Sequence, residues 1–216
     1  MQKIKKREDI SLVEPASGFT RWGGRALVLA GMLWIVTYLA GVLARKLIDP
    51  EYFDGSALMW MGMIASEAAQ LCLGVGLVTL GTRLWTRAKV LAFGGIVLET
   101  IALVTLLINL ALFPNLLDGA IFPRELSAVT TVALFAGMAL LGIATLRTRA
   151  LPGFAALVLL LVGILTVPLI FLAFPLGSVL PNYLVSDLPL ALAAFLLMLI
   201  GFVVLRRWRE RAFPNV

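Results

Sequence analysis

Six long apolar blocks, separated by shorter polar connections, dominate the chain. They run over about residues 26–44, 57–80, 89–112, 127–146, 153–174 and 186–205. Each block is close to the roughly 20 residues that an α-helix needs to cross a hydrocarbon core about 30 Å thick. The pattern therefore predicts an all-α fold, a polytopic membrane bundle of about six transmembrane helices.

Polar, basic segments flank the six blocks at both ends of the chain. Residues 1–25 are expected to form a cytoplasmic N-terminal segment, and residues 206–216 a cytoplasmic basic tail. The first block is expected to be retained rather than cleaved as a signal peptide. The lead-in before it is long, and the basic pair Arg45-Lys46 follows it.

The distribution of Lys and Arg predicts the orientation of the bundle. Of the 18 basic residues, fifteen lie in the N-terminal segment, the 81–89 and 147–152 connections and the tail, and three lie on the other side (Arg45, Lys46 and Arg124). Basic residues favour the cytoplasmic side, so both termini are expected to be cytoplasmic. Interfacial aromatic residues agree with these boundaries: Trp22, Trp85 and Trp208 on the inner side, and Tyr52, Trp60 and Tyr183 on the outer side.

Composition narrows the function classes. Hydrophobic residues make up 61% of the chain and charged residues 14%, which is typical of a protein in lipid rather than in water. The net charge of +6 comes from short runs between apolar blocks, so we expect the lipid bilayer, and no nucleic acid, as a partner. With no histidine and one cysteine, no metal site, cofactor or intrachain disulfide is expected. Cys72 is interpreted as a small buried apolar residue.

Two glutamates interrupt the apolar blocks. Glu67 lies about ten residues into the second block and Glu99 about ten into the third, counted from opposite ends, so both are expected roughly 15 Å deep and at one level. All Lys and Arg lie at or beyond the block ends. Each carboxyl is therefore expected to be neutral unless a cavity admits water or a cation, and two facing carboxyls would share a proton.

Other polar and aromatic residues lie near these glutamates along the sequence. Together with Glu67 and Glu99 they form the candidate intramembrane site: Gln70, Thr100, Asn109, Trp34 and Tyr38. One interpretation is a polar pocket between the first three helices. The other is that both glutamates donate hydrogen bonds to neighbouring helices, with Gln70 and Asn109 as partners. For Trp34 and Tyr38, simple packing is favoured.

Known catalytic motifs are not found in the sequence. The chain has no H-E-x-x-H zinc motif, no G-x-S-x-G nucleophile elbow and no phosphate-binding loop. No catalytic residue is therefore assigned, and the chain is not expected to be an enzyme.

Three features of the third, fourth and fifth blocks form a pattern. They are Leu98-Glu99 with the later Asn109, then Phe135-Ala-Gly137 with Leu140-Leu141-Gly142, and then Leu151-Pro152 followed by Leu160-Leu161-Val162-Gly163. In this pattern the chain resembles, over about residues 57–175, an uncharacterised family of bacterial multi-pass membrane proteins, a domain of unknown function. The resemblance implies a bundle in the bacterial cytoplasmic (inner) membrane and assigns no site.

Two function hypotheses follow from the sequence. The first is a non-enzymatic structural, regulatory or partner-binding bundle, whose partner is a second copy or another membrane protein. The second is a small carrier for a proton, a cation or a small amphiphile, using Glu67 and Glu99. An enzyme acting on lipid ranks third.

Overall fold

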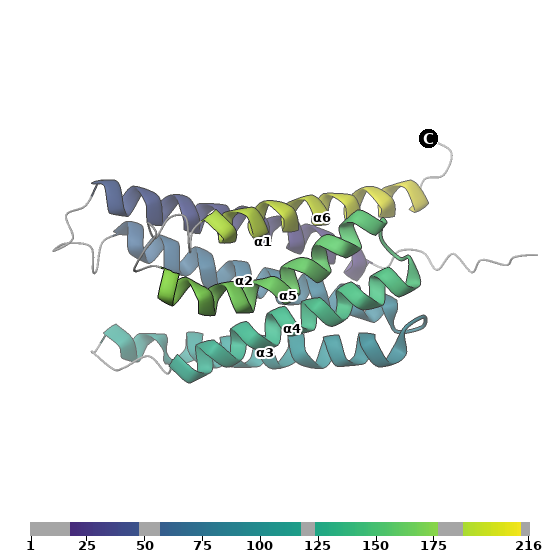
Figure 1. Ribbon diagram of the computed structural model, residues 1–216, viewed down its shortest axis with the longest axis horizontal. Coiled ribbons are helices and arrows are strands. Elements are labelled where there is room, and N and C mark those ends of the chain that lie inside the picture. Colours follow the sequence, from purple (N-terminus) through teal and green to yellow (C-terminus); the bar gives the residue numbers. More distant parts are fainter. Residues whose placement is uncertain (1–17, 48–56, 118–123, 177–187, 213–216) are drawn as a thin grey trace, which may run out of the picture.

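The chain is all-helical over the residues that the computed structural model describes, 18–47, 57–117, 124–176 and 188–212. The six helices are α1 (Gly18–Leu47), α2 (Ala57–Leu84), α3 (Lys89–Leu117), α4 (Arg124–Thr148), α5 (Gly153–Leu176) and α6 (Leu188–Ala212). Residues 1–17, 48–56, 118–123, 177–187 and 213–216 lie outside the described residues. Figure 1 shows the helices side by side along one common direction.

Each helix contains most of one predicted block, and α1 differs most from its prediction. It begins at Gly18 rather than near residue 26, so the last part of the expected polar lead-in is helical. Gly23 and Gly24 do not break this helix, because both are buried. The Cα of Gly23 packs against Thr79 of α2, and the helix-breaking tendency of glycine is offset by this close contact between helices.

Four helices are long and apolar enough to cross a membrane. Their candidate spans are Trp22–Leu43, Ala57–Leu84, Lys89–Leu112 and Leu126–Thr148. In α5 and α6 the described apolar stretches are shorter, Gly153–Leu169 and Ala191–Arg206. Large apolar side chains such as Ile64, Phe93 and Phe154 are exposed on the outside of the bundle, which suits a lipid-facing surface.

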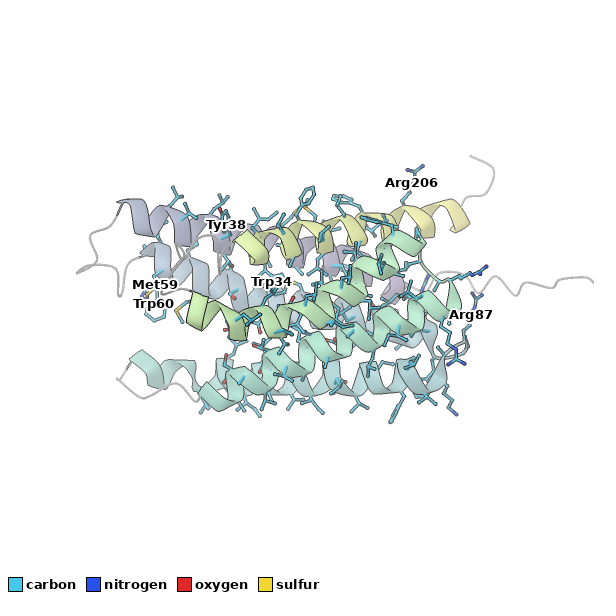
Figure 2. All side chains as sticks on the ribbon, viewed as in Figure 1. Trp34, Tyr38, Met59, Trp60, Arg87 and Arg206 are labelled. Atoms are coloured by element: carbon cyan, nitrogen blue, oxygen red, sulfur yellow. The ribbon has the colours of Figure 1, made fainter. Side chains whose placement is uncertain are left out.

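The helices alternate in direction and pack in a ring. From α1 to α5, each helix packs against the next along the chain, and α6 packs against α1. Between α5 and α6 there is little contact. The start of α1, the α2–α3 turn, the α4–α5 turn and the end of α6 lie at one end of the bundle, on the right of Figure 1. Arg87 and Arg206 lie at this end in Figure 2. We name it the basic end.

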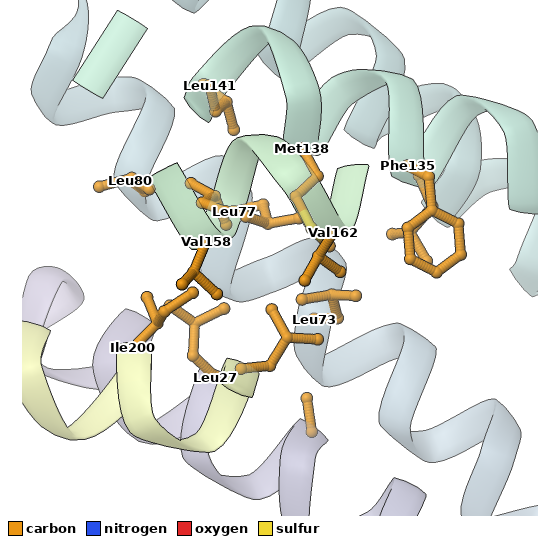
Figure 3. Packing of buried hydrophobic residues seen from close by; sticks show 14 of the residues in the cluster. Leu27, Leu73, Leu77, Leu80, Phe135, Met138, Leu141, Val158, Val162 and Ile200 are labelled. Atoms are coloured by element: carbon orange, nitrogen blue, oxygen red, sulfur yellow. The ribbon is translucent and has the colours of Figure 1, made fainter. Parts of the chain in front are cut away.

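Buried apolar side chains from all six helices meet in the interior of the bundle. Figure 3 shows Leu27 of α1 and Ile200 of α6 facing side chains of α2, α4 and α5. The largest fully buried side chains include Leu73, Leu77 and Met138. This interior is apolar, so the few polar groups within it lack the partners that water would supply.

Glycines allow the closest contacts between helices. A Cβ on Gly163 of α5 would lie 2.5 Å from the backbone N of Ala139, and one on Gly142 of α4 would lie 2.7 Å from the Cα of Leu160. The same occurs between α1 and α6, where a Cβ on Gly31 would lie 2.6 Å from the carbonyl O of Ala194. Small residues of this kind let helix backbones approach in lipid, where packing rather than the hydrophobic effect drives association.

The α4–α5 turn uses a left-handed residue. Arg149 has φ of 53°, and the next amide, of Ala150, donates to the carbonyl of Thr145 over 3.2 Å. This is the hydrogen bond of a helix C-cap in which glycine is the usual left-handed residue. The turn thus reverses the chain within a few residues and leaves the Arg149 side chain exposed at the basic end.

Candidate functional site

Glu99 lies on the face of α3 that packs against α4. The buried residues of α3 recur at intervals of three and four: Ala92, Gly95, Glu99, Ala102, Leu106 and Asn109. This spacing forms one stripe along a helix. A Cβ built on Gly137 of α4 would lie 2.5 Å from Oε1 of Glu99 and 3.0 Å from its Cδ. The carboxyl group therefore fills the space that the glycine leaves.

The Glu99 carboxyl is completely enclosed. The residue is 0% exposed, and neither Oε1 nor Oε2 has a hydrogen-bond partner among the residues that the structure describes. An unpaired buried polar group costs free energy, and an ionised one costs far more. Because neither oxygen has a partner, the hydrogen bonds that Glu99 was expected to donate to neighbouring helices are not formed. Glu99 is held by shape complementarity with Gly137.

Glu67 has different surroundings, although it too is in a long apolar helix. It is half-buried on α2 and borders an open groove of about 240 Å³ between α2 and α3. The other lining residues are all apolar: Met63, Ile64, Ala68, Leu71 and Leu110. Oε2 of Glu67 is buried and has no hydrogen-bond partner. We call this feature the Glu67 groove.

The packing of α2 on α3 places the two glutamates at different levels. A Cβ on Gly81 would meet Ile96, and two turns further along α2 a Cβ on Gly74 would meet Leu103. Continuing this antiparallel register puts Glu67 opposite Leu110, and both residues line the groove. Glu99 is about eleven residues from Leu110 along α3, which corresponds to roughly 16 Å.

The expectation that Glu67 and Glu99 share one level is therefore wrong. It assumed that the second and third blocks begin at opposite membrane surfaces. However, α2 has 28 residues and extends over roughly 42 Å, more than the hydrocarbon thickness. Depths counted from opposite ends of such helices cannot be compared. Glu99 lies nearer the basic end, and Glu67 lies about 5 Å beyond the midpoint of α2 on the other side.

The remaining candidates are distributed between these two levels. Thr100 is exposed, and its hydroxyl donates to the carbonyl of Ile96 over 2.8 Å. It therefore faces away from the carboxyl of Glu99. Asn109 is 5% exposed and its Oδ1 has no partner; it adjoins Leu110 and lies at the level of Glu67. Gln70, one turn from Glu67, is half-buried.

Trp34 is part of the core, and Tyr38 lies one turn further along α1. The Trp34 ring is 3% exposed and stacks on Phe135 of α4, with centroids 6.2 Å apart and ring planes at 16°. Tyr38 is half-buried. Figure 2 shows Trp34 in the middle of the bundle and Tyr38 further from the basic end. Trp34 does not line the Glu67 groove.

Three features of the site were not predicted from the sequence: the contact of Gly137 with Glu99, the apolar lining of the groove, and a hydroxyl pair between α3 and α4. In that pair Thr130 donates to Thr105 over 2.8 Å. The interval of three and four residues along the α3 stripe would have indicated which side of α3 is buried. It would not have identified the residues of α4 that it meets.

The two carboxyls differ in what they can do chemically. Glu99 has no adjoining space for a ligand, whereas Glu67 offers a carboxyl at the edge of a groove that opens on the outside of the bundle. Within the described residues, no group of three His, Cys, Asp or Glu side chains is placed to hold a metal ion. The chemistry that the described residues offer at the groove is that of a single carboxyl.

Comparisons with known proteins add no assignment. No family model, no curated protein and no solved structure matches the chain, so the motif resemblance noted in the sequence stays a prediction.

Proposed function

We propose that the chain is a multi-pass integral membrane protein that binds a partner from the bilayer at the Glu67 groove and catalyses no reaction. The observation that carries this proposal is a carboxyl oxygen with no partner, beside a groove whose other walls are apolar. Polar groups inside a membrane usually face a partner or a cavity, because exposure to lipid costs about 3 kcal/mol when they are charged. A partner bound in the groove would contact the Glu67 carboxyl.

The proposed topology has six crossings, with both termini on the cytoplasmic side of a bacterial cytoplasmic membrane. It is supported by the charge distribution in the sequence and by the alternating directions of the six helices. The four long apolar helices account for four of these crossings. The shorter apolar stretches of α5 and α6 are proposed to cross as well, because α5 packs beside α4 and α6 beside α1 over much of the bundle.

Single cysteines test this topology. In a Cys72→Ser background, Arg87→Cys and Arg149→Cys are expected to react with a membrane-impermeant maleimide only after the cells are opened. Tyr52→Cys and Tyr183→Cys are expected to react in intact cells. Reaction of Arg149→Cys in intact cells would overturn the six-crossing arrangement. Arg87→Cys is the control in that case, because its lack of reaction would show that the reagent had not entered the cells.

Reaction with a lipid-soluble carbodiimide tests whether the groove is open to the bilayer. The neutral carboxyl gives its proton to one carbodiimide nitrogen, and its oxygen bonds to the central carbon; the adduct then rearranges to a stable N-acylurea. Glu67 borders an open groove and Glu99 is enclosed. Glu67 is therefore expected to react at least about tenfold faster.

Peptide mass spectrometry of protein in lipid nanodiscs measures this reaction, since each adduct adds the whole mass of the reagent. Glu67→Gln is expected to abolish most labelling, and Glu99→Gln to leave it nearly unchanged. Equal labelling of both carboxyls, or labelling of Glu99 alone, would contradict a groove that is accessible at Glu67 and would remove the basis of the proposed function.

A carrier that holds its substrate at both carboxyls is less well supported. The register of α2 on α3 separates Glu67 from Glu99 by roughly 16 Å along the helix axes, and no described space adjoins Glu99. One small ligand therefore could not contact both groups at the same time.

A further inference from the structure

The Glu67 groove joins one acid to a continuous apolar wall. Among the described residues that line it, Glu67 is the one titratable group. The others contribute only hydrocarbon and thioether surface: Met63, Ile64, Ala68, Leu71 and Leu110. Ile64, at the rim, is 62% exposed. A ligand can therefore enter sideways from the lipid without crossing a polar barrier.

The membrane depth of Glu67 limits what can pair with it. An ionised group at this depth costs about 3 kcal/mol to insert, so the neutral carboxylic acid of Glu67 is favoured over its carboxylate. A partner helix with Lys or Arg at the same depth would have to bring its own charged side chain into the membrane before it docked, at a similar cost of about 3 kcal/mol. A neutral amine dissolved in the bilayer bears no such cost, because no charge enters the membrane with it.

The dimensions of the groove suit a small organic group. Its volume of about 240 Å³ exceeds the roughly 150 Å³ of an apolar protein cavity that binds benzene. It is also open on one side, so an alkyl chain longer than the groove can continue into the surrounding lipid. Only the amine and the first part of its hydrocarbon chain need to fit.

We propose that the Glu67 groove binds lipophilic tertiary amines from the bilayer, with the amine nitrogen at the carboxyl of Glu67. This proposal rests on the proposed function and names its ligand class. On binding, the carboxyl O–H bond breaks and an N–H bond forms on the lone pair of the amine. The products are a carboxylate and an ammonium ion in contact, with no change in net charge. The new N–H donates to a carboxylate oxygen of Glu67.

A direct binding experiment tests the proposal with two probes that differ by one methyl group. N,N-dimethyldodecylamine has a lone pair and can accept the proton, whereas dodecyltrimethylammonium is permanently charged and cannot. Binding of each radiolabelled probe to protein in neutral-lipid nanodiscs is measured at fixed pH, with empty nanodiscs subtracted. The tertiary amine is expected to bind at least about tenfold more tightly than the quaternary ion.

Two variants locate the binding to the groove. Glu67→Gln keeps the shape and removes the transferable proton, so it is expected to weaken amine binding at least about tenfold. Ala68→Phe keeps the carboxyl and fills the groove, and a similar loss is expected. The control is Glu99→Gln, which should leave amine binding within about twofold of the wild type. Circular dichroism and size-exclusion chromatography verify that each variant is folded.

Three results would overturn the proposal. Equal affinity for both probes would exclude proton transfer, unchanged amine binding in Glu67→Gln would exclude the carboxyl, and binding that occurs equally in empty nanodiscs would show partition into lipid only. If the amine fails to bind while Glu67 still reacts with the carbodiimide, the ligand class is wrong and the accessible groove stands. If Glu67 also fails to react, the proposed function fails with it.

Discussion

Replacing Gly163 with alanine is expected to destabilise the bundle by about 2–3 kcal/mol, at the upper end of the usual cost of overpacking. The new Cβ would lie 2.5 Å from the backbone N of Ala139, 2.8 Å from its Cα and 2.8 Å from the carbonyl O of Phe135. These atoms belong to the backbone of α4 and cannot move aside as a flexible side chain can. The two helices would have to separate, which loses contacts along the whole α4–α5 interface.

The chain offers a matched control for this variant. Gly153 begins the same helix, and a Cβ there would have no neighbour within 4 Å. Gly153→Ala is therefore expected to change stability by less than about 0.5 kcal/mol. Equilibrium unfolding by SDS in bicelles, followed by circular dichroism, measures both. If the two variants proved equally stable, α4 and α5 would not be in backbone contact at Gly163.

Replacing Glu99 with methionine is expected to stabilise the bundle by about 1–3 kcal/mol, the usual cost of a buried polar group without a partner. Methionine has a similar length, is flexible enough to fill the space beside Gly137, and needs no hydrogen bond. The prediction follows from two unpaired oxygens on a residue that is 0% exposed.

Two further variants make this result interpretable. Glu99→Gln keeps an unpaired polar group in place and is expected to gain no stability. Glu67→Met, at a half-buried position, should change stability less than Glu99→Met does. The same SDS unfolding assay applies. A loss of more than about 1 kcal/mol in Glu99→Met would mean that the carboxyl makes a stabilising interaction, and the enclosed, unpaired geometry would be wrong.

If Glu99→Met stabilises the bundle, the result is also evidence about the role of Glu99. Functional sites often contain polar residues that make the protein less stable than an apolar residue at the same position would. In this structure, however, Glu99 has no adjoining space for a ligand, whereas Glu67 has one. The two glutamates are equivalent in sequence terms, as acids within long apolar blocks, and the fold gives them different surroundings.

The helices themselves were predictable from the sequence because their signal is local. Long apolar runs ended by basic or proline-containing segments predicted blocks over about residues 57–80 and 89–112, and α2 (Ala57–Leu84) and α3 (Lys89–Leu117) contain these residues. The start of α1 at Gly18 was not predicted, since Gly23 and Gly24 disfavour a helix by their own propensities. Their contacts with neighbouring helices outweigh that preference, and such contacts involve residues far apart in the chain.

The candidate site was predictable only as a set of residue types. Glu67, Glu99 and Asn109 were identified because polar groups in apolar blocks are conspicuous, and all three contain buried atoms without partners. Their grouping was not predictable. Helix rise gives a position along one helix, but it does not give the vertical offset between two helices.

The sequence by itself therefore determined a helical chain of long apolar blocks with two carboxyls within them. It predicted six crossings, and four of the helices are long and apolar enough to cross a membrane. The tertiary structure alone decided which carboxyl is enclosed and which is accessible. The contacts of Gly74 with Leu103 and of Gly81 with Ile96 fix the register of α2 on α3, and Gly137 leaves the space that Glu99 fills. The physical reason is that the register between two helices depends on the fit of small residues against large ones across their interface. The hydrophobic pattern along the chain does not specify that fit.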